Sequence, residues 1–185
     1  MGLPVSPLSL LPSLPPRVTA DGACLDAFQR ELDYIFRTLR RLGTSASEVE
    51  DLAQELFLVL RRSWSQYDPG RPLRPYLFGI AFRIASVHRR KHGREVAFEM
   101  VEVIDSGTGP DDALQTKQAR ALLLAALEQI PLLRRAVLVM HDLDDVPVGD
   151  VASALGIPRF TVYSRLRKAR RELHTAVRRL TKAEI

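Results

Sequence analysis

Cysteine is nearly absent from this sequence, since Cys24 stands alone among 185 residues. A single cysteine excludes a disulfide framework or a cysteine-based metal site within one chain. No apolar run reaches the roughly 18 residues that a membrane-spanning helix needs. The histidines lack the HExxH spacing of a zinc site, so we expect no metal. They are His88, His92, His141 and His174.

Other patterns that carry chemistry are also missing. The sequence has no glycine-rich phosphate loop, no clustered acidic metal site and no nucleophile triad, which argues against a nucleic-acid enzyme. We therefore expect no catalysis, no cofactor and no small-molecule substrate. The alternation typical of β-strands is missing too, so the expected fold class is all-α.

Residues 1–20 are expected to form a disordered tail. Five prolines are interleaved with leucines there, and they prevent a helix. A secretory signal needs positive charge before an unbroken apolar core, whereas Arg17 follows the leucines. Gly2 and Ser6 match the myristoylation pattern, which is short and common by chance. A signal peptide is therefore not expected, and we expect a cytoplasmic protein.

What the sequence does have is positive charge. The formal net charge is +5 and the sequence pI is about 9.8. An excess of this kind favours an anionic partner such as nucleic acid. The hydrophobic fraction of 46% is ordinary for a globular protein, and 185 residues suffice for two small domains.

The clearest pattern lies in residues 148–173, where we expect two helices around a tight turn. Apolar residues at helical spacing lead to Leu155, and Gly156 supplies the left-handed position that ends a helix. Pro158 cannot continue that helix but suits the first turn of the next. The second helix has an apolar face with spacings of four, three and four. This face comprises Val162, Leu166, Ala169 and Leu173.

The outer face of this second helix is strongly basic, and Glu172 alone opposes its charge. A short helix, a glycine turn and a basic second helix are typical of a helix-turn-helix, whose second helix fits the DNA major groove. The alternative is an ordinary helical hairpin whose basic face is solvated. DNA binding is favoured because the glycine turn and the basic face occur together, as a helix-turn-helix requires. The face comprises Arg159, Tyr163, Ser164, Arg165, Arg167, Lys168, Arg170 and Arg171.

Residues 21–92 are expected to form a first helical domain. Apolar residues recur every three or four positions across residues 25–42, which predicts one amphipathic helix ended by Gly43. Ser47 and Glu50 have capping-box spacing, so the next helix should begin at Glu48. Its outer face carries a stripe that composition alone would assign to solvated surface. The stripe consists of Asp51, Gln54, Glu55, Leu58 and Arg62.

Residues 61–94 combine nine lysines or arginines and a single acid with several aromatic rings. Basic side chains bind phosphates and aromatic rings stack on unpaired bases, so the segment favours a melted-duplex site. About half of the rings are expected to lie in the core instead. The rings are Trp64, Tyr67, Tyr76, Phe78 and Phe82.

Residues 93–112 hold six acidic residues against Arg94 alone, which predicts a flexible acidic linker. Residues 113–182 should then form a second helical domain. A helix over residues 113–130 ends at Pro131, and a second helix over residues 132–141 precedes the helix-turn-helix. The second of these helices should turn Leu133, Ala136, Val137 and Met140 inward.

Five segments resemble motifs of bacterial RNA polymerase sigma factors, and their order is the family's. DLAQELF at residues 51–57 resembles DLxQExF, and YLFGIA at residues 76–81 resembles WLxxIA. LEQIP at residues 127–131 resembles LxxLP, and VASALGI at residues 151–157 resembles IAxxLGI. TVYSRLRKAR at residues 161–170 resembles TVxSRLxRAR. The two-domain layout is similar to the extracytoplasmic-function (ECF) group.

The resemblance implies an N-terminal core-binding bundle, a promoter-binding C-terminal helix-turn-helix domain and roles for individual residues. Contacts with the clamp helices of the largest subunit of core RNA polymerase are implied for Asp51, Gln54, Glu55 and Leu58. Opening of the minus-ten element, with capture of a flipped base, is implied for Tyr67, Arg71, Arg74, Phe82, Arg83, Arg89 and Arg90. Reading of the minus-thirty-five element is implied for Arg159, Thr161, Tyr163, Ser164, Arg167 and Lys168.

Partners also follow from the resemblance: core RNA polymerase, promoter DNA and an anti-sigma protein. The chain departs from the family at Tyr76, Arg83, Val87 and Tyr163, so no base preference is predicted. A conventional regulator is the alternative, with the helix-turn-helix as output and the first domain as a sensor. That alternative predicts tight DNA binding by a dimer without polymerase.

Overall fold

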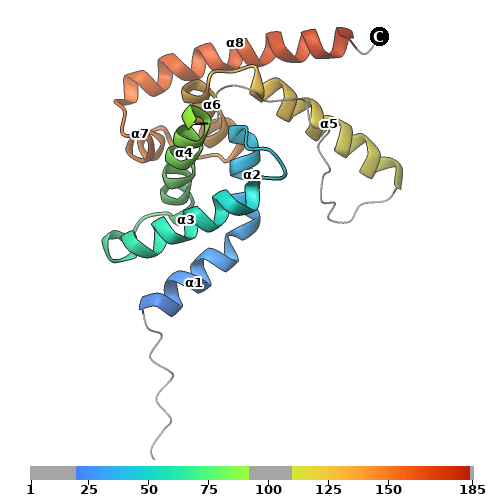
Figure 1. Ribbon diagram of the computed structural model, residues 1–185. Coiled ribbons are helices and arrows are strands. Elements are labelled where there is room, and N and C mark those ends of the chain that lie inside the picture. The colour runs from blue at the N-terminus through green and yellow to red at the C-terminus, as the bar shows by residue number, and fades with distance from the viewer. Residues whose placement is uncertain (1–19, 92–109, 184–185) are drawn as a thin grey trace, which may run out of the picture.

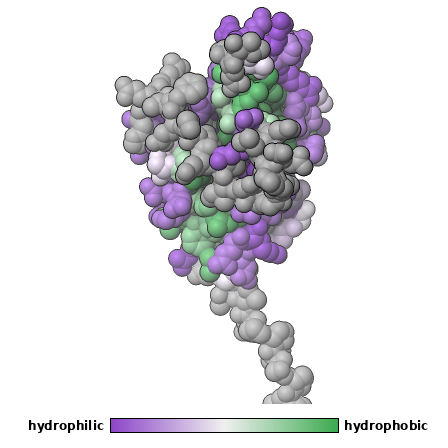
Figure 2. Space-filling model, turned by 90° about the vertical axis from the view of Figure 1, so that its right-hand side faces the viewer, coloured by the Kyte–Doolittle hydropathy of each residue, from purple (hydrophilic) through white to green (hydrophobic). Residues whose placement is uncertain are grey.

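The computed structural model describes residues 20–91 and 110–183. Within these two stretches every regular element is helical, as the sequence predicts (Figure 1). Residues 1–19 of the predicted tail and residues 93–109 of the predicted linker lie outside the described part, as does residue 92. Residues 110–112 were also predicted as linker, but they form the start of α5 (Pro110–Glu128). On the side of the molecule from which α5 (Pro110–Glu128) projects, apolar residues reach the surface in patches bordered by hydrophilic ones (Figure 2).

The first described stretch forms one helical unit. Helices α2, α3 and α4 pack on one another, and α1 packs against α3 (Figure 1). Apolar residues at helical spacing from all four helices meet in its core, which agrees with the predicted periodicity. The elements are α1 Ala20–Arg30, α2 Leu32–Leu42, α3 Val49–Ser63, η1 Trp64–Gln66 (a short 3-10 helix) and α4 Leu73–Lys91.

The single helix predicted across residues 25–42 is wrong, because the chain breaks at Glu31 between α1 and α2. Glu31 has φ −103° and ψ 10°, outside helical geometry. Helix α1 packs on α3 and η1, whereas α2 packs on both α3 and α4. The predicted end of α2 is confirmed, because Gly43 has φ 94° in the left-handed region.

The predicted capping box of Ser47 and Glu50 is also wrong. The Ser45 hydroxyl instead donates to the Glu48 carboxylate at 2.5 Å, and the Ser45 backbone N–H donates to the same oxygen at 3.4 Å. Ser45 and Glu48 have the same three-residue spacing, so the observed pair lies two residues before the predicted one. Helix α3 accordingly begins at Val49, one residue after the predicted start.

The second described stretch contains the predicted helix-turn-helix. Gly156 has φ 64° and ends α7, and Pro158 lies immediately before α8. The predicted inner face of α8 is confirmed, since Val162, Leu166 and Ala169 are buried. The elements are α5, α6 Leu132–Leu138, η2 Val139–Leu143 (a π-helical turn), α7 Val148–Leu155 and α8 Arg159–Ala183.

The prediction that Leu133 lies on the inner face of α6 is wrong, because this side chain is 50% exposed. Arg135 is instead fully buried, and its guanidinium donates to the backbone carbonyls of Leu42 at 2.8 Å, Glu128 at 2.7 Å and Ile130 at 3.3 Å. Hydrogen bonds to these three carbonyls compensate for the removal of the guanidinium from water. A pattern of apolar residues in the sequence cannot predict the burial of such a charged side chain. Burial lowers the pKa of Arg135 to about 10, so the guanidinium is still charged at neutral pH.

The two units share one continuous core. Helix α4 contacts α7, and α2 contacts α5 and α6. At one close approach, a Cβ built on Gly79 of α4 would lie 2.8 Å from the backbone oxygen of Ala154 in α7. Arg41 donates to the Asp144 carboxylate at 2.7 Å, and the Tyr34 hydroxyl donates to it at 3.1 Å. Burial raises the pKa of Asp144, and Arg41 opposes the rise.

The close approach at Gly79 gives a testable prediction. Alanine there is expected to lower the free energy of unfolding by about 1–2 kcal/mol, because overpacking a backbone carbonyl outweighs the helix propensity of alanine. Gly149→Ala in α7 is the matched control, since its Cβ would meet only the flexible Arg159 guanidinium, at 3.1 Å. Urea denaturation measures both variants. Equal stability of the two would contradict the tight packing of α4 on α7.

Candidate protein and nucleic-acid interfaces

The polar stripe predicted on α3 is exposed along its whole length, and Leu58 within it is 51% exposed. Beside the stripe runs a groove of about 420 Å³ between α3 and the α1–α2 segment. Its floor includes the rings of Phe28 and Phe57, whose centroids are 4.9 Å apart. An apolar groove with a polar rim is the usual composition of a protein interface. The lining residues are Phe28, Leu32, Phe36, Glu50, Ala53, Gln54, Phe57 and Leu58.

The aromatic residues around η1 form a cluster that the sequence did not predict as a unit. The ring of Tyr67 stacks on Trp64 at a centroid distance of 5.3 Å and meets Tyr76 at 5.2 Å. The Tyr67 hydroxyl donates to the Arg71 carbonyl at 2.7 Å, and the Tyr76 hydroxyl donates to the Ser63 hydroxyl at 2.8 Å. These bonds fix the rings at the start of the loop that leads to α4.

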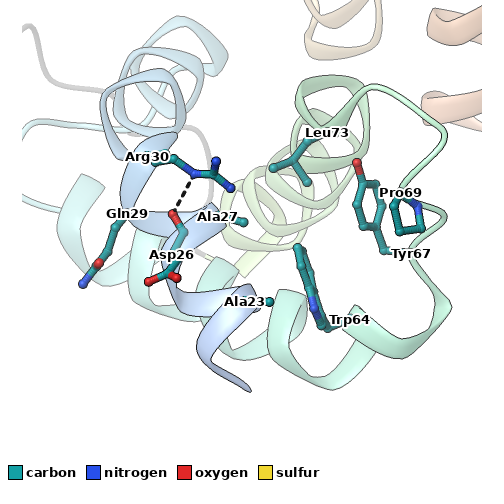
Figure 3. Close-up of a pocket in the computed structure, with 9 residues that line it drawn as sticks. All are labelled: Ala23, Asp26, Ala27, Gln29, Arg30, Trp64, Tyr67, Pro69 and Leu73. Carbon is teal, nitrogen blue, oxygen red and sulfur yellow. Dashed lines mark hydrogen bonds between the residues drawn. The ribbon is translucent and has the colours of Figure 1, made fainter. Parts of the chain in front are cut away.

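Two members of this cluster, Trp64 and Tyr67, line a cleft of about 870 Å³ (Figure 3). Trp64 and Tyr67 lie on one side, and α1 contributes Asp26 and Arg30 on the other. The Arg30 side chain donates to the Asp26 carbonyl at 3.3 Å, and its guanidinium lies beside the cleft (Figure 3). An open cleft with aromatic rings and a cation can hold a planar base beside a phosphate.

The residues predicted to bind melted DNA fall into two groups. Tyr67 and Arg71 lie in the loop between η1 and α4, and Arg74 lies in the first turn of α4. Of these three residues, Tyr67 lines the cleft. Arg74 is paired with Glu31 at 2.8 Å, and its guanidinium lies 5.1 Å from the centroid of the Tyr34 ring. The other group lies further along α4 and consists of Phe82, Arg83, Arg89 and Arg90.

The four residues of the α4 group differ in their exposure to solvent. Arg83 and Arg90 are exposed, and each donates to a backbone carbonyl of its own helix, at 2.9 and 3.2 Å. Phe82 is partly buried against the core. Arg89 is partly buried near Gly43, close enough to Arg135 to lower its pKa. The structure therefore brings Arg83 and Arg90 to the surface but places Arg89 at the contact between the two units.

The predicted upstream reader on α8 is largely exposed. Thr161 is the partly buried member, and its carbonyl accepts the Ser164 hydroxyl at 3.0 Å. Arg170 lies elsewhere, because it forms a two-bond pair with Asp142 at 2.7 and 2.8 Å and lowers the pKa of that carboxylate. The exposed members are Arg159, Tyr163, Ser164, Arg167 and Lys168.

Sequence reasoning missed Phe160, which is 75% exposed on the same helix. Its spacing to Ser164 and Arg167, four and seven residues further on, places it on their face. The spacing is present in the sequence, but a phenyl ring carries no hydrogen-bonding group that would mark it as a base-reading residue.

Two further kinds of feature are absent from the described residues. None of the helices there combines the length and the apolarity needed to cross a bilayer. No group of three histidine, cysteine or acidic side chains in those same stretches is arranged to hold a metal ion.

Two sequence profiles of one protein family match this chain in succession. The profile for sigma-70 region 2 matches residues 27–95, which include most of the first helical unit. The profile for sigma-70 region 4 matches residues 120–173, which include the helix-turn-helix.

Individual proteins of the same kind are also similar. The ECF RNA polymerase sigma factor SigE of Mycolicibacterium smegmatis is 27% identical over 163 residues, which are 84% of this chain and 63% of SigE. SigW of Bacillus subtilis is 24% identical over 80% of this chain and 85% of its own length. The sigma factor RpoE of Bartonella quintana, solved with the anti-sigma factor NepR, has a TM-score of 0.61 at 23% identity and covers 83% of this chain and 98% of RpoE.

Proposed function

This chain belongs to the sigma-70 family of RNA polymerase sigma factors, and on that premise we propose that it directs core RNA polymerase to specific promoters. One observation carries the proposal: a unit with an exposed docking stripe and a unit with an exposed basic recognition helix occur in the family's order. The chain acts by binding and leaves covalent chemistry to the polymerase.

The docking surface for polymerase is the α3 stripe together with its groove. Asp51, Gln54 and Glu55 supply polar contacts, and Leu58 adds an exposed apolar side chain at the edge of the groove. A helical partner such as a clamp helix could lay its apolar side chains into the groove and pair with the rim.

The first unit also stabilises melted DNA near the start site. A flipped base enters the cleft beside Trp64 and Tyr67, while Arg71 and Arg74 bind the neighbouring phosphates. Arg74 must release Glu31 to do so, and an exposed pair of this kind costs only ~0–1 kcal/mol to break. Arg83 and Arg90 continue the basic surface along α4.

The second unit places α8 in the major groove of the upstream element. Arg167 and Ser164 face outward and can reach base edges, while Arg159 and Lys168 bind phosphates. An anti-sigma protein is a further proposed partner, because the structurally similar RpoE of Bartonella quintana was solved with one.

Run-off transcription tests the proposal. Purified core polymerase is combined with a promoter library, with and without the chain, and transcript starts are mapped. We expect fixed start sites that appear only when the chain is added. Unchanged start sites, together with tight duplex binding by a dimer of the free chain, would favour a conventional regulator instead.

A further inference from the structure

Phe160 is the most exposed large apolar side chain in the described part of the protein. It is 75% exposed and Tyr163 is 61% exposed, compared with 51% for Leu58 and 50% for Leu133. Single apolar side chains on a surface are ordinary. Phe160 and Tyr163 lie one turn apart at the start of α8, and the exposed face of this helix is basic. Two exposed aromatic rings in this position require an explanation.

The position of Phe160 on α8 is set by the helix period. Phe160, Ser164 and Arg167 follow one another at spacings of four and three, and all three are exposed. Val162 and Leu166 lie on the opposite face and are buried, at 0% and 4% exposure. Phe160 therefore shares the face that is proposed to enter the major groove.

The chemistry of that groove limits what a phenyl ring can recognise. Base edges there present hydrogen-bond donors and acceptors, and thymine adds one apolar group, its C5 methyl. Ser164 and Arg167 can bind the donors and acceptors. The ring of Phe160 has neither, so the thymine methyl is the feature of a base edge that it can select.

We propose that Phe160, flanked by Tyr163, contacts thymine C5 methyl groups in the upstream promoter element and selects thymine at the facing positions. The inference rests on the proposed function, because it requires α8 to lie in the major groove. Burial of one methyl group changes an equilibrium about fourfold. Each contacted thymine should therefore bind about fourfold better than uracil, which lacks only that methyl.

The test uses the chain assembled with core polymerase. A promoter is first selected from a library randomised in the upstream element. Matched duplexes then carry deoxyuridine in place of each thymidine in turn, and competition binding gives the thymine-to-uracil ratio at every position. We expect a ratio of about four at one or two positions for the wild-type chain.

Substitutions test whether the Phe160 ring is responsible for the thymine-to-uracil ratio. Phe160→Ala should reduce it to about one. Leu133→Ala is the matched control, because it removes an exposed apolar side chain from α6 and should leave the ratio unchanged. Circular dichroism checks that each variant keeps the helical content of the parent.

Three outcomes would overturn the inference. A wild-type ratio of one at every upstream position would contradict the methyl contact, and so would an unchanged ratio in Phe160→Ala. Neither result would contradict promoter-directed initiation. Failure of the complete holoenzyme to select any upstream sequence would instead defeat the proposed function, and the inference with it.

Discussion

Replacement of Arg135 by methionine is expected to lower the free energy of unfolding by about 3–5 kcal/mol. Methionine fills much of the same space, but it donates no hydrogen bonds to the carbonyls of Leu42, Glu128 and Ile130. Each buried acceptor left without a partner costs ~1–3 kcal/mol, which the relief from burying a charge offsets only in part. Urea denaturation followed by circular dichroism measures the loss.

Arg134→Met is the matched control, because it makes the same chemical change one residue away. Arg134 is partly exposed and pairs with Glu172 at 2.7 Å, so its loss should cost no more than ~1 kcal/mol. Arg135→Lys should fall between the two, since it keeps the charge but has one donor group instead of a fork. Equal stability of the two methionine variants would contradict the role of Arg135 as a buried connection between the units.

The helix-turn-helix could be predicted because its signals are local. Gly156 ends α7 and the three-four spacing of Val162, Leu166 and Ala169 sets the buried face of α8, and neither depends on a distant partner. The exposure of the α3 stripe followed from the same kind of periodicity. Those parts of the fold were fixed by residues within one or two turns of each other.

The missed features depend on residues far apart in the chain. Arg135 is buried because it bonds to Leu42, 93 residues away, and no apolar pattern encodes that partner. The break at Glu31 arises from the separate packing of α1 and α2. The contact of Gly79 with Ala154 likewise required both units to be seen together.

That contact has a consequence for the proposed function. The minus-ten and minus-thirty-five elements are about 25 base pairs apart, or about 85 Å along the duplex at 3.4 Å per pair. Helices α4 and α7 touch in this structure, so the two readers cannot reach both elements without separating. Residues 92–109 supply a covalent reach of at most about 60 Å between the units. This reach is shorter than the separation of the two elements, so in an opened chain the units themselves must span the remainder.

The polymerase contact gives the second large expected effect. Replacement of Gln54 and Glu55 together by alanine should weaken binding to core RNA polymerase by about 10- to 100-fold, because a few residues near the centre of an interface carry most of its affinity. Both side chains are exposed and no buried atom depends on them, so the fold should be retained. Binding is measured by titration of labelled chain with core enzyme, and stability by thermal unfolding.

Glu128→Ala with Gln129→Ala is the control pair, because it removes the same two side-chain types from an exposed position on the other unit. The backbone carbonyl of Glu128, which accepts a bond from Arg135, remains in this variant. Its affinity for core enzyme should stay within about twofold of the parent, in line with the small effect of most contacts outside a hot spot. If both double variants bind equally well, the docking surface lies elsewhere; if both bind weakly, the affinity loss reflects charge and not the α3 stripe.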